Sequence, residues 1–135
     1  MRIDHIELFV PDREQAVRWY RDVLGFQVLE AHRAWATKQG PLMISNDGGN
    51  TMIALFEGQA QGEREVCGFR RVAFRVGGAD FLRFLESSGK WRPTPLGAKD
   101  IRDHERAISV YFSDPWGNLL EVTTYEHTEV RSALD

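Results

Sequence analysis

The feature that most constrains the fold of this chain is an approximate internal repeat. Residues 3–10 align with residues 69–76, so that His5 and Arg71 take equivalent places at an offset of 66 residues. Residues 47–56 align in the same way with residues 114–123, at an offset of 67. Each half has the pattern of one helix and four strands, and one such half alone cannot cover its own sheet. The sequence therefore predicts one domain at 1–126, built from modules at about 1–58 and 67–126 and followed by a polar tail at 127–135.

Local patterns define the elements of the first half. Residues 3–10 alternate between two faces and predict a strand, with His5, Glu7 and Phe9 on the same side. Asp12 is suited to begin a helix and Gly25 to end it in the left-handed conformation. Strands are predicted at 26–35, 41–45 and 51–56, and residues 58–65 read as a linker.

The second half repeats this order with weaker signals. Strands are predicted at 69–76, 107–112 and 119–125, and a short helix around 81–85 ends near Gly89. Residues 91–103 remain ambiguous, because Pro93 and Pro95 restrict them to an edge strand or a loop. The tail from Glu126 is expected to be frayed.

Composition excludes several classes of function. The net charge of −3 provides no broad basic field for nucleic acid. The longest apolar runs have the length of strands, so no membrane span is expected, and the N-terminus lacks the apolar core of a signal peptide. Cys67 is the single cysteine, it has no evident histidine partner, and it is expected to be inert. We expect a soluble cytoplasmic protein.

Two motifs carry a resemblance to a known family. Residues 111–121 read YFSDPWGNLLE, and an opening DHI at 4–6 is followed by WYRDVLGF at 19–26. This arrangement resembles the vicinal-oxygen-chelate superfamily of glyoxalase I, bleomycin-resistance proteins and extradiol dioxygenases. The resemblance implies an α+β fold in which paired βαβββ modules form a curved mixed sheet around a cavity. It also implies a homodimer. In many members each cavity uses the first half of one chain and the second half of the other, and in that arrangement His5 of one chain would meet Glu121 of the partner subunit.

The resemblance further implies a divalent metal ion that chelates two neighbouring oxygens of the substrate. The four ligand positions correspond here to His5, Ala54, Arg71 and Glu121. Imidazole and carboxylate are suitable ligands, but Ala54 has no donor atom and Arg71 stays protonated. The implied cofactor is therefore one ion of Fe, Mn, Ni or Zn bound by an incomplete set, or no ion at all.

Several polar residues are candidates for catalysis. Glu7 shares a face with His5 and is a candidate replacement ligand or general base, or else a rim carboxylate paired with arginine. Tyr111 matches the place of an active-site tyrosine in the extradiol dioxygenases, but the pattern fits a half-buried sheet residue equally well. His104, on the loop before that strand, is a candidate mobile acid or base; the alternative is an ordinary surface histidine.

The remaining candidates are expected to bind substrate. Arg71 is suited to an anionic group, or to an ion pair with Glu121. Trp35 and Trp91 are candidates for the apolar lining of a cavity. Two functions remain open: a metal-dependent lyase or dioxygenase acting on a small molecule, and a metal-free small-molecule binder of the bleomycin-resistance kind. Nothing in the sequence favours a third possibility, a non-catalytic regulatory module.

Overall fold

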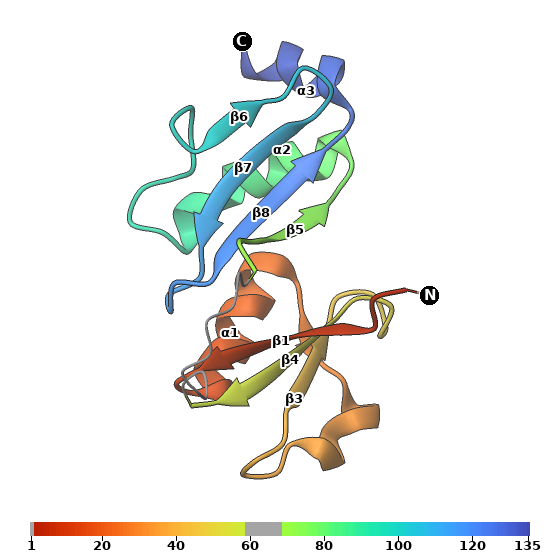
Figure 1. Cartoon of the computed structure of the whole chain (residues 1–135). Coiled ribbons are helices and arrows are strands. Elements are labelled where there is room, and N and C mark those ends of the chain that lie inside the picture. The colour runs from red at the N-terminus through yellow and green to blue at the C-terminus, as the bar shows by residue number, and fades with distance from the viewer. Residues whose placement is uncertain (1, 59–68) are drawn as a thin grey trace. The chain divides into compact units, whose positions relative to one another are not determined.

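The computed structural model describes residues 2–58 and 69–135 of the chain (Figure 1). The chain divides into two compact units, Met1–Glu65 and Val66–Asp135. Each unit is a four-stranded mixed sheet with a helix packed on one face, which confirms the predicted α+β class and the βαβββ order. Cys67 and all of the predicted linker except Gly58 lie outside the described residues.

The first unit has the sheet order β1-β4-β3-β2. Strand β1 is parallel to β4, and β3 is antiparallel to both of its neighbours. The elements are β1 (His5–Val10), α1 (Arg13–Leu24), β2 (Gln27–Val28), a 3-10 helix η1 (Glu30–Trp35), β3 (Leu42–Ser45) and β4 (Met52–Glu57).

Helix α1 begins and ends where the sequence indicates. The Asp12 carboxylate accepts the backbone N–H of Gln15 at 2.9 Å, and Gly25 ends the helix with φ 71°. Tyr20 is fully buried and meets Phe26 edge to face, with ring centroids 6.3 Å apart. Burying side chains of this size stabilises the unit by roughly 2 kcal/mol each.

The long strand predicted at 26–35 is wrong. Only Gln27–Val28 pairs with β3, and pairing ends where the Leu29 N–H donates to the Met43 carbonyl oxygen at 2.9 Å. The residues that follow form η1, and none of them is buried. They include two alanines and lack β-branched side chains, so their local preference favours a helical turn.

The second unit has the matching sheet order β5-β8-β7-β6. The elements are β5 (Val72–Arg75), α2 (Gly78–Ser87), a 3-10 turn η2 (Ser88–Lys90), β6 (Ile101–Asp103), β7 (Ile108–Ser113), β8 (Leu119–Thr124) and α3 (His127–Leu134). The ambiguous segment before β7 thus ends in a three-residue edge strand, as the prolines allow.

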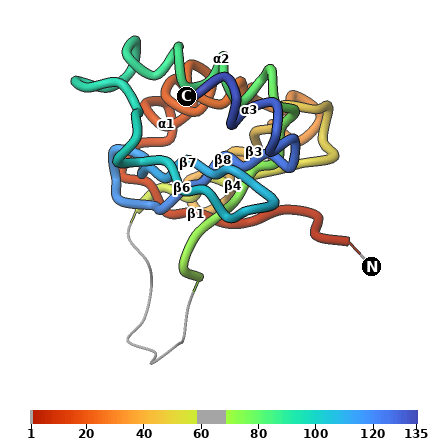
Figure 2. Tube along the Cα trace, turned by 90° about the horizontal axis from the view of Figure 1, so that it is seen from above, coloured from red at the N-terminus to blue at the C-terminus, as the bar shows by residue number. Residues whose placement is uncertain are grey.

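The expected frayed tail is instead helix α3, which lies on the same side of the sheet as α2 (Figure 2). Val130 is fully buried, so this segment has an apolar anchor despite its polar composition. The Glu126 carboxylate accepts the backbone N–H of Gly78 at 2.9 Å, which satisfies a free donor at the start of α2. No helix among residues 2–58 and 69–135 is long and apolar enough to cross a bilayer.

The alternation of strand residues gives each sheet a helix-covered face and an open face. In the first unit Val10, Ile53 and Leu55 are buried on the helix-covered face. The open face carries His5, Glu7, Phe9, Met52, Ala54 and Phe56. In the second unit the open face carries Ala73, Arg75, Ser109, Tyr111, Glu121 and Thr123.

Candidate functional site

His5 lies between two carboxylates at the start of β1. Its Nδ1 is 2.8 Å from Asp4 Oδ2, and its Nε2 is 3.5 Å from Glu7 Oε1. The hydrogen bond to Asp4 raises the pKa of His5 above 6.5; partial burial opposes the rise and Glu7 adds to it. With 36% of its side chain exposed, His5 is open to a ligand from the solvent side.

Glu7 lies directly opposite Ala54 in the parallel register of β1 and β4. Ala54 is fully buried, and Glu7 is the adjacent residue on the same face. The Glu7 carboxylate on β1 therefore stands beside Ala54, a metal-ligand position by family resemblance that has no donor atom here. The neighbouring Phe9 and Phe56 are also paired in register, with ring centroids 6.0 Å apart.

These residues border a pocket of about 490 Å³ on the first unit, lined by Glu7, Phe9, Lys38, Gln39, Phe56 and Glu57. Arg13 holds the loop that supplies Lys38 and Gln39. Its Nη1 donates to the carbonyl oxygens of Thr37 at 2.9 Å and Gly40 at 2.8 Å. The pocket has an apolar floor and a charged rim, the arrangement common in small-molecule sites.

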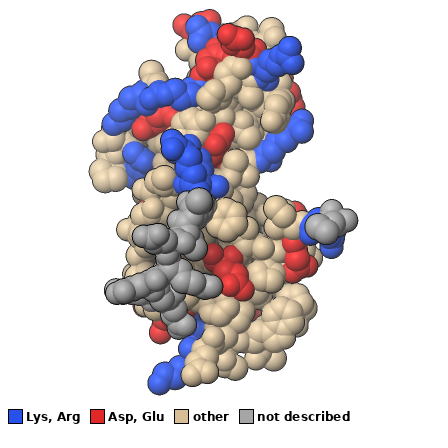
Figure 3. Space-filling model, in the orientation of Figure 1, with Lys and Arg blue, Asp and Glu red and all other residues tan. Residues whose placement is uncertain are grey.

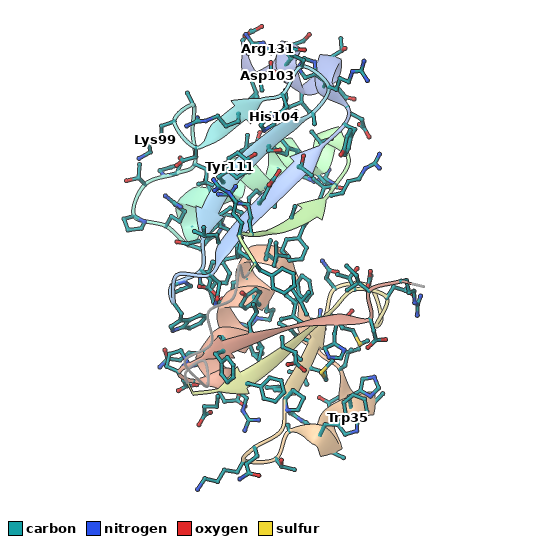
Figure 4. The ribbon with its side chains drawn as sticks, in the orientation of Figure 1. Trp35, Lys99, Asp103, His104, Tyr111 and Arg131 are labelled. Atoms are coloured by element: carbon teal, nitrogen blue, oxygen red, sulfur yellow. The ribbon has the colours of Figure 1, made fainter. Side chains whose placement is uncertain are left out.

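The open face of the second unit carries the clearest group of functional side chains. The Arg71 guanidinium lies over the ring of Tyr111, 4.2 Å from its centroid. His104 Nε2 is 2.9 Å from Tyr111 Oη, and the two side chains lie together at the edge of the sheet (Figure 4). Tyr111 is half-buried, while His104 is exposed. Tyr111 thus connects a cation to an imidazole.

Glu121 stands next to this group. It is paired in register with Tyr111 on one side and Ala73 on the other. Within residues 2–58 and 69–135 no ion pair joins it to Arg71. The Arg71 Nε is buried and meets no hydrogen-bond acceptor in the described part of the chain. This N–H is a buried donor without an acceptor among the described residues, which costs free energy.

The two tryptophans occupy different surroundings. Trp35 is 53% exposed on η1 and stacks on His32, with ring centroids 4.1 Å apart. Trp91 packs against Phe84 of α2 and Phe112 of β7, with centroids 5.8 and 5.6 Å apart. This cluster belongs to the helix-covered side of the second sheet. The structure therefore places Trp91 away from the open face that carries Tyr111.

Two of the four metal-ligand positions implied by the resemblance carry side chains that cannot bind a metal. Ala54 offers only a buried methyl group, and Arg71 offers a cation stacked on Tyr111. Within the parts of the two units that the structure describes, no three His, Cys, Asp or Glu side chains form a group suited to a metal. The residues present do not fit a four-ligand ion.

Comparison with protein families identifies the superfamily to which this chain belongs. Residues 2–122 match the family model of the glyoxalase/bleomycin resistance protein/dioxygenase superfamily. The chain belongs to this superfamily. No curated protein matches its sequence. The motifs at both ends of the chain had indicated this membership, and the match covers nearly the whole of both modules.

Solved structures of similar fold include fosfomycin resistance proteins. FosX from Mesorhizobium loti is 26% identical, with a TM-score of 0.64 and 95% of each chain covered. FosX from Listeria monocytogenes is 17% identical, with a TM-score of 0.68 and 96% and 98% covered. The Listeria protein has also been solved with Mn(II) and sulfate, and a mutant of it with Mn(II) and 1S,2S-dihydroxypropylphosphonic acid.

Sequence reasoning missed two features of these surfaces. Phe56 and Lys38 join Glu7 in one pocket only because β4 and the loop after η1 return to β1. The contact of Arg71 with Tyr111 depends on β8 lying between β5 and β7, an order that periodicity alone does not give. The internal repeat offers a sequence signal for the strand order behind both features, because equivalent strands occupy equivalent places in the two sheets.

Proposed function

We propose that this member of the superfamily binds a small anionic molecule, with Arg71 as the principal contact for the negative group. The observation that carries the proposal is the Arg71 guanidinium, stacked on Tyr111 with its Nε lacking an acceptor among the described residues. A guanidinium presents several N–H donors in a planar fork that matches carboxylate and phosphonate oxygens. Stacking on the ring fixes the plane of that fork before a ligand arrives.

Several neighbours support an anion at this place. Tyr111 provides a hydroxyl on this face. Ser109 and Thr123 lie on the same face, but the Ser109 hydroxyl is buried and donates to Thr123 Oγ1 at 2.9 Å. In the space-filling view, basic side chains lie over this face of the second unit (Figure 3). The phosphonic acid and sulfate found in the Listeria protein are anions of this chemical type. The FosX relatives make a fosfomycin-like phosphonate our first choice of ligand class, and drug sequestration or inactivation the proposed role.

Glu121 is paired in register with Tyr111, on which Arg71 stacks, and it sets the geometry of the anion. Glu121 shares the open face with Tyr111, so an anion must approach Arg71 from the side away from this carboxylate. An anionic ligand that also carries a hydroxyl group satisfies both residues, since the hydroxyl donates to Glu121. We therefore expect a hydroxylated phosphonate to bind more tightly than a plain alkyl phosphonate.

The test is titration calorimetry with propylphosphonate. Arg71→Gln removes the charge and should weaken binding at least tenfold, because a charge-assisted hydrogen bond contributes about 1.5–3 kcal/mol. Arg75→Gln is the matched control: this residue lies on the same face and its guanidinium stacks on Tyr125 at 4.6 Å. Equal affinity of the wild type and both variants would exclude Arg71 as the anion contact.

The second candidate is a metal-dependent lyase or dioxygenase with an incomplete protein ligand set. The observation that favours it is Glu7, which approaches His5 Nε2 and stands beside Ala54. By the family resemblance His5 and Glu121 would then be the protein ligands, with Glu7 or water completing the set and Tyr111 and His104 as acid or base groups. Elemental mass spectrometry after exposure to Mn, Fe, Ni and Zn decides the matter. Near one equivalent of a single ion, lost on His5→Ala, would support this candidate.

A homodimer stays a prediction of the family resemblance. Light scattering of the full chain measures its mass directly. A mass of about twice the 15.5 kDa of the chain is expected, and a mass equal to a single chain would contradict the prediction.

A further inference from the structure

The bond between His104 and Tyr111 has two possible directions. Tyr111 Oη and His104 Nε2 are 2.9 Å apart, and either group is able to supply the proton between them. If the tyrosine donates, its oxygen presents only lone pairs to a ligand. If the histidine donates from Nε2–H, the tyrosine O–H is free to donate elsewhere. The side chain of a loop histidine therefore decides what Tyr111 presents on the open face.

We propose that His104 is a positioning residue that holds the Tyr111 hydroxyl as a donor toward a bound anion. This inference rests on the proposed function, in which the ligand is an anion held by Arg71. Arg71 lies over the ring of Tyr111, so an anion bound to the guanidinium is within reach of the ring edge that carries the hydroxyl. An anion accepts hydrogen bonds and is repelled by lone pairs, so it selects the state in which His104 donates.

The Nε2–H tautomer of His104 produces that state. Its acceptor nitrogen is Nδ1, so Nε2–H donates to Tyr111 Oη and the tyrosine proton points away from the ring. An anion held by Arg71 then meets a donor on Tyr111 and not its lone pairs.

His104 has several charged neighbours. The Asp103 carboxylate is already engaged by the N–H of Glu105, by His127 and by Arg131. The charged and titratable groups on the elements around His104 are Arg71 before β5, Asp103, Glu105 and Arg106 on its own hairpin, Glu121 on β8, and His127 and Arg131 on α3.

The first test needs no ligand. Nitrogen-15 chemical shifts of the His104 ring at pH 8 report which nitrogen carries the proton. We expect the Nε2–H tautomer, because it alone lets the Tyr111 hydroxyl donate outward. Predominance of the Nδ1–H tautomer would overturn the inference, whatever the ligand proves to be.

The second test is calorimetric binding of ethanesulfonate at pH 8. His104→Gln keeps an N–H donor in place of the imidazole, so this variant should bind within about threefold of the wild type. His104→Leu has no donor and should bind about tenfold more weakly. His32→Leu, the same change on η1, should leave the affinity unchanged.

The outcomes separate the inference from the function on which it rests. Sulfonate binding that is lost in Arg71→Gln but is equal in His104→Leu and the wild type would refute the role of His104 and leave the anion site intact. Failure of ethanesulfonate and propylphosphonate to bind at any pH would refute the anion site. The nitrogen-15 experiment then still decides the direction of the Tyr111–His104 bond.

Discussion

The guanidinium of Arg71 lies 4.2 Å from the centre of the Tyr111 ring, on the open face of the second sheet. Family resemblance assigns the place of Arg71 to a metal ligand. A side chain with a permanent positive charge thus stands where other members of the superfamily are expected to hold a cation. This exchange keeps the sign of the charge and changes the chemistry, because a guanidinium binds oxygens through N–H donors and does not activate water as a metal does.

Restoring an imidazole at this position should restore affinity for metal. Arg71→His places an imidazole in the unit that carries Glu121, and we expect Mn or Zn affinity to increase at least tenfold over wild type. Anion binding in the absence of metal should fall in the same variant. Calorimetric metal titration measures the gain, and no increase would show that the other ligands do not cooperate with position 71.

Glu7 offers a way to identify the remaining ligand. It stands opposite Ala54, the other position that has lost its donor. Glu7→Gln should lower metal affinity about tenfold if this carboxylate, beside His5, replaces the absent group. Glu14→Gln, on the exposed surface of α1, makes the same change of charge and should have no effect. Equal losses in both variants would point to long-range charge alone.

The tyrosine ring should matter apart from its hydroxyl. Tyr111→Phe keeps a face for Arg71 and removes only the hydrogen bond to His104, so we expect a moderate loss of anion affinity, about threefold to tenfold. Tyr111→Leu removes both and should cost more. Calorimetry on the two variants measures the difference, and identical affinities would show that the stack does not orient Arg71.

Docking of α3 should depend on pH through Asp103. The N–H of Glu105 lowers the pKa of the Asp103 carboxyl below 3.8, and the bond to His127 lowers it further. A carboxyl with a depressed pKa stabilises the fold above its unfolded-state pKa, and this contribution is lost as pH falls through the lower, folded-state value. Asp103→Asn should therefore destabilise the protein at pH 6, and this effect should shrink as the pH falls below 3.8. Hydrogen exchange of α3 amides, followed against pH, tests this directly.

Close packing of α2 and α3 requires a glycine at position 78. A Cβ there would lie 3.0 Å from a Glu126 carboxylate oxygen and 3.1 Å from Val130 Cγ2. Gly78→Ala should destabilise the protein by about 1–2 kcal/mol, because overpacking outweighs the better helix propensity of alanine. Gly97→Ala, where the added Cβ meets nothing within 4 Å, is the control. A stability curve in urea for each variant measures the cost.

The sequence predicted the fold well wherever the pattern was local and repeated. Asp12 and Gly25 end α1 through bonds that depend on near neighbours, so periodicity and capping were sufficient. It failed at 26–35 and 127–134, where tertiary contacts decide. The buried Val130 and the Glu126 cap of α2 turn a polar tail into a helix, and neither contact has a signal in the local pattern.

The sequence predicted which residues belong to the candidate site, but not the contacts between their side chains. His5, Glu7, Arg71, Tyr111, His104 and Glu121 were all singled out from motifs and strand alternation. The two contacts that give the site its chemistry, Arg71 on Tyr111 and His104 to Tyr111, join residues forty and seven positions apart in the chain. They depend on strand order and on the path of the β6–β7 hairpin, which propensity does not encode.

The central claim is that Arg71 supplies the positive charge for an anionic ligand without help from a metal. The most direct measurement is calorimetric binding of propylphosphonate to protein stripped of metal by a chelator, repeated after addition of Mn(II). We predict the same affinity in both conditions and a loss of at least tenfold in Arg71→Gln. Binding that appears only after Mn(II) is added, and that survives Arg71→Gln, would contradict the account.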